Sequence, residues 1–127
     1  MIKKDKPSIL VVEDEQTLLK AVTYALDEAG FNVSSAIDGD SAMEKVREKP
    51  DLVLLDIIIP RKSGLEVLKE MKADPALSDI PVLLLTNLSD DDSVSQGIAL
   101  GARGYLVKSN YDLESVVAKV KEVLKMK

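Results

Sequence analysis

Short apolar runs and longer stretches of helical periodicity alternate along this chain. Five runs rich in branched aliphatic residues predict β-strands. These runs are residues 8–13, 31–36, 52–55, 80–85 and 104–107. After each of them, apolar residues recur at helical spacing. The predicted helices cover residues 15–29, 40–48, 63–73, 90–101 and 113–124. The chain therefore consists of five consecutive strand–helix units.

This alternation decides the fold class. A regular succession of strands and helices predicts an α/β protein, with a parallel sheet covered by helices on both faces. Only residues 31–36, FNVSSA, alternate between apolar and polar positions, which predicts a more exposed strand there. The length of 127 residues is typical of one domain, so we expect a single domain over residues 1–127.

Polar residues follow four of the predicted strands. Glu13 and Asp14 end the first strand, Asp56 the third, Thr86 the fourth and Lys108 the fifth. Asp56 is the most unusual, because it stands between apolar residues in the run DLVLLDIIIP and an unpaired buried carboxylate is costly. The carboxyl ends of parallel strands meet at one edge of the sheet, where ligands bind in such folds. We therefore expect these five side chains to converge.

Three clustered carboxylates repel one another unless a cation lies among them. Hard divalent cations such as Mg²⁺ prefer oxygen ligands and bind through a few carboxylates, water and phosphate oxygens. A carboxylate can also act as a nucleophile that forms an aspartyl phosphate. Phosphoryl transfer depends mainly on positioning and charge neutralisation, which Mg²⁺, Lys108 and the hydroxyl of Thr86 are suited to supply.

Composition removes several other classes of function. The chain has no Cys and no His, which excludes disulfides, thiolate metal sites, Cys nucleophiles and a phosphohistidine in this chain. A net charge of -5 argues against a broad nucleic-acid-binding face. No signal-peptide pattern follows MIKKDKPS, and the most apolar stretch is far shorter than a membrane span. We expect a cytoplasmic protein without membrane insertion.

Four motifs occur in order at matching spacing: VVEDE, LVLLDIIIPRKSG, VLLLT and GARGYLVK. Together they resemble the receiver domain of response regulators in two-component signalling, over nearly the whole chain from Ser8 to Leu124. The resemblance implies a chemotaxis-regulator-like fold: a doubly wound (βα)5 five-stranded parallel sheet in the flavodoxin-like order 2-1-3-4-5. It also implies a switch and not an enzyme, one that catalyses only its own phosphorylation and slow dephosphorylation.

The resemblance assigns roles to individual residues. Asp56 would accept phosphate from the phosphohistidine of a sensor histidine kinase or phosphotransfer protein. Asp14 would bind Mg²⁺ directly and Glu13 through water, and Asp56 and the backbone carbonyl of Ile58 would complete the set of protein ligands.

Further roles concern signal output. Thr86 would bind the phosphoryl oxygen and move on activation, Lys108 would pair with the phosphate, and Tyr105 would switch between outward and inward rotamers. The face formed by the fourth helix, fifth strand and fifth helix would then bind a downstream protein, with no direct role for nucleic acid.

The sequence departs from the family pattern beside these residues. Ser109 follows Lys108, where the family usually has proline, and Asn87 follows Thr86, where a small residue is common. Ile58 and Leu88 are bulky and apolar at two positions near the path of the attacking water. We therefore expect Asn87 to affect access to the phosphate, and Ile58 and Leu88 to slow its hydrolysis.

Each of these residues has an ordinary explanation when taken singly, such as a helix start, a strand-end turn or a solvated lysine. Their occurrence together at four strand ends favours the functional interpretation. A haloacid-dehalogenase-like phosphatase needs a second Asp two residues after the first, where Ile58 stands. A flavodoxin-like carrier needs a phosphate-binding loop rich in Gly, Ser and Thr after its first strand, and this loop is absent. A dinucleotide binder needs the motif G-x-G-x-x-G, which is also absent. A receiver-like scaffold that acts without phosphorylation remains the alternative.

Overall fold

The structure is a computed structural model that describes residues 6–86, 91–108 and 112–125. It confirms the five strand–helix units. The strands are β1 (Ser8–Val12), β2 (Asn32–Ala36), β3 (Leu52–Asp56), β4 (Val82–Thr86) and β5 (Gly104–Val107). The helices are α1 (Gln16–Glu28), α2 (Gly39–Val46), α3 (Gly64–Ala73), α4 (Asp91–Ala99) and α5 (Leu113–Lys125). The predicted bounds are correct to within one or two residues at each end.

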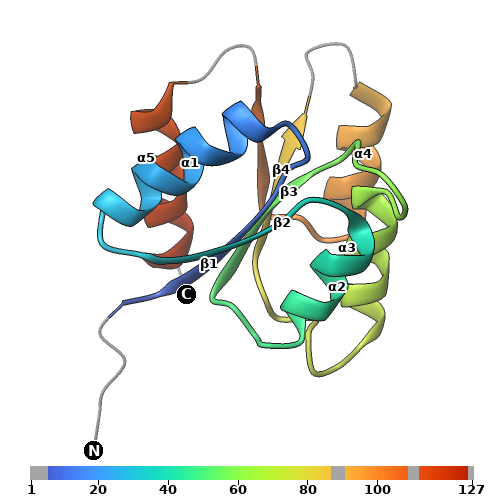
Figure 1. The fold of residues 1–127 in the computed structure, drawn as a ribbon. Coiled ribbons are helices and arrows are strands. Elements are labelled where there is room, and N and C mark those ends of the chain that lie inside the picture. Colours follow the sequence, from blue (N-terminus) through green and yellow to red (C-terminus); the bar gives the residue numbers. More distant parts are fainter. Residues whose placement is uncertain (1–5, 87–90, 109–111, 126–127) are drawn as a thin grey trace, which may run out of the picture.

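The five strands form one parallel sheet in the order β2-β1-β3-β4-β5, as the family resemblance implied. Helices α1 and α5 pack on one face of the sheet, and α2, α3 and α4 pack on the other (Figure 1). β3 lies in the middle, between β1 and β4, so the end of β3 is enclosed by its neighbours.

Alternate residues of the inner strands supply two separate hydrophobic cores. Leu10 and Val12 of β1 face α2 and α3, whereas Ile9 and Val11 face α1 and α5. This arrangement follows from the period of two in a β-strand. All five residues of β3 are buried, as its continuous apolar run predicts for a strand covered on both faces. The edge strand β2 is more exposed, also as predicted.

N-terminal capping residues mark the first residue of α1 and α3. Glu15 accepts a hydrogen bond from the Leu18 N–H at the start of α1. Ser63 and Glu66 form a reciprocal capping box at the start of α3. These caps lie at the carboxyl-end edge of the sheet, where the predicted site is found.

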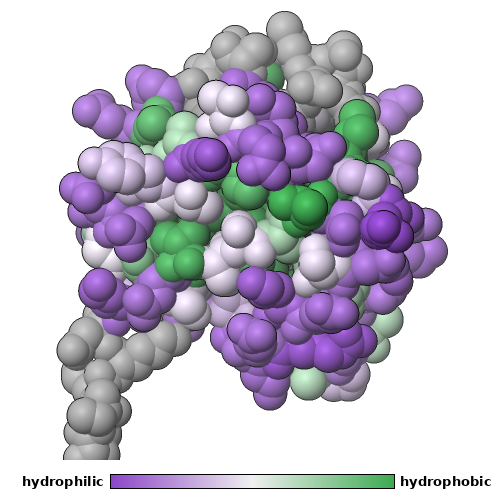
Figure 2. Space-filling view, in the orientation of Figure 1, coloured by the Kyte–Doolittle hydropathy of each residue, from purple (hydrophilic) through white to green (hydrophobic). Residues whose placement is uncertain are grey.

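The surface shows no extended apolar belt in the view of Figure 2, where hydrophobic residues form small patches separated by hydrophilic ones. Within residues 6–86, 91–108 and 112–125, no helix is both long and apolar enough to cross a membrane.

Candidate functional site

The structure brings the three predicted carboxylates together. Asp56 is the last residue of β3, and Glu13 and Asp14 follow β1, the neighbouring strand. Each of the three offers a carboxylate oxygen within 4.8 Å of the other two. Glu13 and Asp56 are buried, with Asp56 only 3% exposed, while Asp14 is open to solvent. The cluster therefore has one accessible side, next to Asp14.

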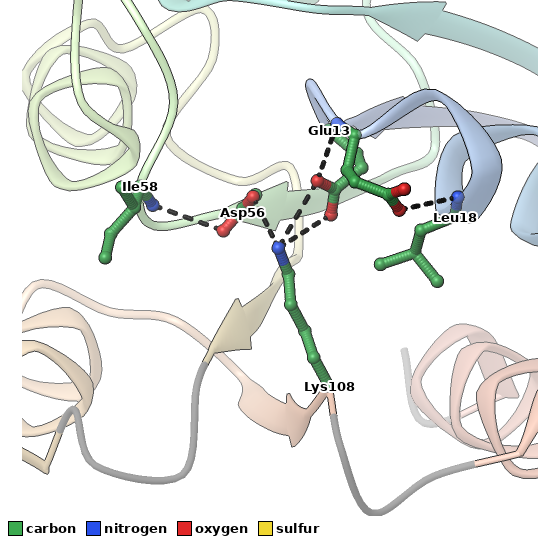
Figure 3. Close-up of polar contacts among 6 residues, drawn as sticks. Glu13, Leu18, Asp56, Ile58 and Lys108 are labelled. Carbon is green, nitrogen blue, oxygen red and sulfur yellow. Dashed lines mark hydrogen bonds and ion pairs between the residues drawn. The ribbon is translucent and has the colours of Figure 1, made fainter.

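Lys108 reaches this cluster from the end of β5 (Figure 3). Its Nζ lies 2.7 Å from Asp56 Oδ2 and 3.0 Å from Glu13 Oε1. The Lys108 N–H donates to the carbonyl oxygen of Thr86 at 2.7 Å, which ties the start of the Lys108 loop to the end of β4. The ammonium thus connects strand ends that are far apart in the sequence.

Charge in the cluster is not balanced. Three carboxylates and one ammonium leave two negative charges uncompensated. Burial raises the pKa of Glu13 above its usual value, although hydrogen bonds from Lys108 and the Glu15 N–H oppose this effect. Burial lowers the pKa of Lys108, but its hydrogen bonds and attraction to Asp56 and Glu13 outweigh burial and raise it overall. The ammonium form of Lys108 is therefore favoured by its surroundings.

The cluster fits a hard divalent cation. Its candidate ligand atoms are all oxygens, and the two uncompensated negative charges would be balanced by the two positive charges of Mg²⁺. Glu13 Oε1 is buried and, although close to Lys108 Nζ, accepts no hydrogen bond from any residue that the structure describes. A buried oxygen in that state is unusual and has bonding capacity left for a cation or its water.

The carboxylate of Asp56 is held by the loop that follows it. The Ile58 N–H donates to Asp56 Oδ1 at 3.2 Å, and Ile58 as a residue is 61% exposed. Gly64, at the start of α3, lies against the Asp56 backbone, where an added Cβ would be 2.2 Å from the Asp56 carbonyl oxygen. Gly64 ends the motif LVLLDIIIPRKSG, but the sequence alone assigned it no role. A glycine directly after the residue that caps a helix is the signal that could have indicated this close backbone contact.

The remaining predicted residues divide into two groups. Thr86 is buried at the end of β4, and Tyr105 lies on β5 and is 48% exposed. Asn87, Leu88 and Ser109 lie outside the described residues, so their predicted roles rest on the sequence.

Comparison with known proteins agrees with this geometry. The profile of the response regulator receiver domain matches residues 9–121. The chain is 36% identical to the alkaline phosphatase synthesis transcriptional regulatory protein PhoP of Bacillus subtilis over 92% of this chain and 48% of PhoP. It is also 36% identical to the phosphate regulon transcriptional regulatory protein PhoB of Escherichia coli over 92% of this chain and 51% of PhoB. The chain thus spans about half the length of these relatives.

Solved structures show the same fold. The phosphorylated cyanobacterial phytochrome response regulator RcpA superposes with a TM-score of 0.80 at 32% identity, covering 93% of this chain and 91% of RcpA. The chemotaxis response regulator CheY4 of Vibrio cholerae superposes with a TM-score of 0.85 at 28% identity, covering 93% of this chain and 98% of CheY4.

Proposed function

Because this chain belongs to the response regulator receiver domains, we propose that it is a phosphorylation-controlled switch in which Asp56 accepts the phosphoryl group. The observation that carries the proposal is the position of Asp56. Its carboxylate ends the central strand, is almost fully buried, and has Lys108 Nζ at 2.7 Å and two further carboxylates beside it. A structural strand-end aspartate has no need of this arrangement.

The chemistry proposed for Asp56 is nucleophilic. One carboxylate oxygen attacks the phosphorus of a donor phosphohistidine, the new O–P bond forms as the P–N bond breaks, and the imidazole leaves with its electron pair. Oδ1 is held by the Ile58 N–H and Oδ2 by Lys108. Lys108 therefore stays beside the phosphoryl oxygens and offsets part of their charge.

We assign the metal ligands to the same cluster. Asp14 and Asp56 would bind Mg²⁺ directly, Glu13 through water, and the Ile58 carbonyl would be a fourth protein ligand. When bound, Mg²⁺ supplies the positive charge that phosphoryl transfer requires. Lys108 alone leaves the cluster with excess negative charge, so transfer without the metal is expected to be slow.

The proposed output is a change at Thr86 and Tyr105. The buried Thr86 would bind a phosphoryl oxygen, and the exposed Tyr105 would turn inward into the space that Thr86 leaves, changing the face formed by α4, β5 and α5. Phosphorylation shifts the equilibrium between the outward and inward positions of Tyr105 only if the phosphate contacts these two states differently. Hydrogen exchange of the parent protein with and without beryllofluoride tests this. Equal protection over residues 86–105 in both states would contradict the switch.

The proposed partners are a histidine kinase or phosphotransfer protein as donor and a protein as downstream target. The relatives PhoP and PhoB are named transcriptional regulatory proteins, and this chain corresponds to about half of each. We propose no direct contact with nucleic acid for the region described here.

Labelling by acetyl phosphate tests the proposed function. With Mg²⁺ present, the parent should gain one hydroxylamine-sensitive phosphate, Asp56→Asn should gain none, and Asp14→Asn should be labelled far more slowly. Asp79→Asn removes an exposed carboxylate elsewhere and serves as the matched control, which should behave as the parent. An unlabelled parent, or a labelled Asp56→Asn, would refute the assignment and favour a phosphorylation-independent scaffold.

A further inference from the structure

The loop from β3 to α3, residues 57–63, is bonded to the sheet at its first residue and closed on that same residue by the start of α3. The Ile57 N–H donates to the carbonyl oxygen of Leu85 in β4 at 3.1 Å. At the other end, the Gly64 N–H donates to the Ile57 carbonyl oxygen at 2.8 Å. Ile58 lies between these two anchors, and the chain turns at residues 60–62 before it reaches Gly64.

That turn is strained. Arg61 has a φ angle of 72°, and the Lys62 N–H donates to the Pro60 carbonyl oxygen at 2.9 Å across it. A positive φ at the central residue, with a hydrogen bond between the residues on either side of it, defines the form of γ-turn that is rarer than the inverse form. This conformation is costly for a residue with a Cβ. Lys49 also has a positive φ of 61°, but it lies just after α2, where left-handed residues commonly end helices. Arg61 has no such explanation.

The start of α2 holds the strained turn in place (Figure 1). The Gly39 N–H donates to the same Pro60 carbonyl oxygen at 3.1 Å, so this oxygen accepts two backbone hydrogen bonds. A Cβ added to Gly39 would lie 2.1 Å from the Lys62 carbonyl oxygen, which shows how closely the two backbones approach. Only glycine allows this contact without displacing the turn.

An ion pair adds to this contact but does not account for it. Arg61 Nε lies 3.4 Å from Asp38 Oδ2, and the Arg61 side chain is 65% exposed. Exposed ion pairs of this kind contribute little to stability. Asp38 is also engaged elsewhere, because it accepts from the Ser41 N–H at the start of α2. The backbone conformation of Arg61, and not its charge, is the feature that calls for a reason.

We propose that Arg61 and Gly39 are positioning residues for the phosphorylation site. Gly39 holds the turn at Arg61, and the turn fixes Ile58, whose N–H orients Asp56 Oδ1 and whose carbonyl oxygen is an assigned metal ligand. Strain of this kind collects at functional sites because the surrounding structure can maintain it there. The inference rests on the proposed function, since it concerns the same metal and the same aspartate.

Substitutions at Arg61 separate backbone from charge. Arg61→Gly removes the charge but favours the positive φ, whereas Arg61→Val removes the same charge and disfavours that conformation. Groups that orient metal ligands typically change metal affinity by roughly tenfold or more when they are lost. We expect Arg61→Val to weaken Mg²⁺ binding by roughly tenfold, and Arg61→Gly by less than about twofold.

Two further variants complete the set. Gly39→Ala leaves the loop sequence intact and displaces the turn from outside, so it should weaken Mg²⁺ binding as Arg61→Val does. Lys49→Val introduces the same conformational conflict at the far end of α2 and is the matched control. It should lower thermal stability without changing Mg²⁺ affinity.

Calorimetric titration of Mg²⁺ into each folded variant of residues 1–127 measures the Mg²⁺ affinity, and acetyl phosphate labelling of the same samples gives the rate of phosphorylation. If Arg61→Val and Arg61→Gly bind Mg²⁺ with equal affinity while the parent binds Mg²⁺ and accepts phosphate, the positioning role is refuted and the proposed function is not. Parent-like affinity in Gly39→Ala would likewise refute the positioning role. A parent that neither binds Mg²⁺ nor accepts phosphate would overturn the proposed function as well.

Discussion

Replacing Asp14 by asparagine is expected to stabilise the metal-free protein and to remove its response to Mg²⁺. Asp14 has a carboxylate oxygen within 4.8 Å of those of Glu13 and Asp56. The substitution keeps the shape of the side chain and removes one of three like charges, so repulsion in the cluster falls. It also removes a proposed direct ligand of the metal.

The size of the effect follows from Coulomb's law. Two unit charges at 4.8 Å, the upper bound on these separations, repel by at least about 0.9 kcal/mol in a medium like water and about 3.5 kcal/mol at an effective dielectric constant of 20. Asp14 is exposed, so the lower figure applies to each of its two carboxylate neighbours. Lost attraction to Lys108 offsets part of this. The net gain is expected to be about 1 kcal/mol, or roughly 4 °C in Tm for a domain of this size.

Thermal unfolding followed by circular dichroism, with and without Mg²⁺, provides the assay. The parent should gain stability from Mg²⁺, because a ligand that binds only the native state stabilises it. Asp14→Asn should start higher and gain little. Glu44→Gln, which removes one charge from the exposed surface of α2, is the control and should respond to Mg²⁺ as the parent does. A metal-free Asp14→Asn less stable than the parent, or one with the full Mg²⁺ response, would refute the reasoning.

Three further predictions concern the same site. Gly64→Ala should lower the free energy of unfolding in urea by about 2 kcal/mol, because its Cβ would lie 2.2 Å from the Asp56 carbonyl oxygen; a parent-like midpoint would contradict this. Ile58→Asn and Leu88→Glu should each speed phosphate loss by roughly tenfold, about 1.4 kcal/mol in the barrier, since polar groups can orient the attacking water; a parent that loses phosphate as fast as both variants would exclude apolar shielding. The pKa of Lys108 is raised because its hydrogen bonds and attraction to nearby carboxylates outweigh the opposing effect of burial. The ammonium of Lys108 therefore stabilises the folded protein fully at pH values below 10.5, the ordinary pKa of lysine, and this stabilisation is lost as pH rises through the raised pKa. The difference in unfolding free energy between the parent and Lys108→Met should therefore shrink above pH 10.5, and a constant difference would count against this.

The sequence determined the elements and most of the site, because both depend on local patterns. Periodicity of apolar residues is set by the geometry of a strand or helix, and it placed all five strand–helix units. The rule that parallel strands end at one edge of the sheet then predicted that Asp56, Glu13 and Lys108 lie close together. The order of the strands came from the family resemblance and not from periodicity, which carries no information about which strands are neighbours.

The tertiary structure alone decided how the site is held. Lys108 and Glu13 are 95 positions apart, and their contact depends on how two strands register across the sheet. The left-handed turn at Arg61 and its contact with Gly39 depend on where α2 begins relative to a loop from another unit. Sequence periodicity reports the environment of one element at a time. Close approach between two backbones arises only when separate elements pack, so local sequence patterns cannot predict it.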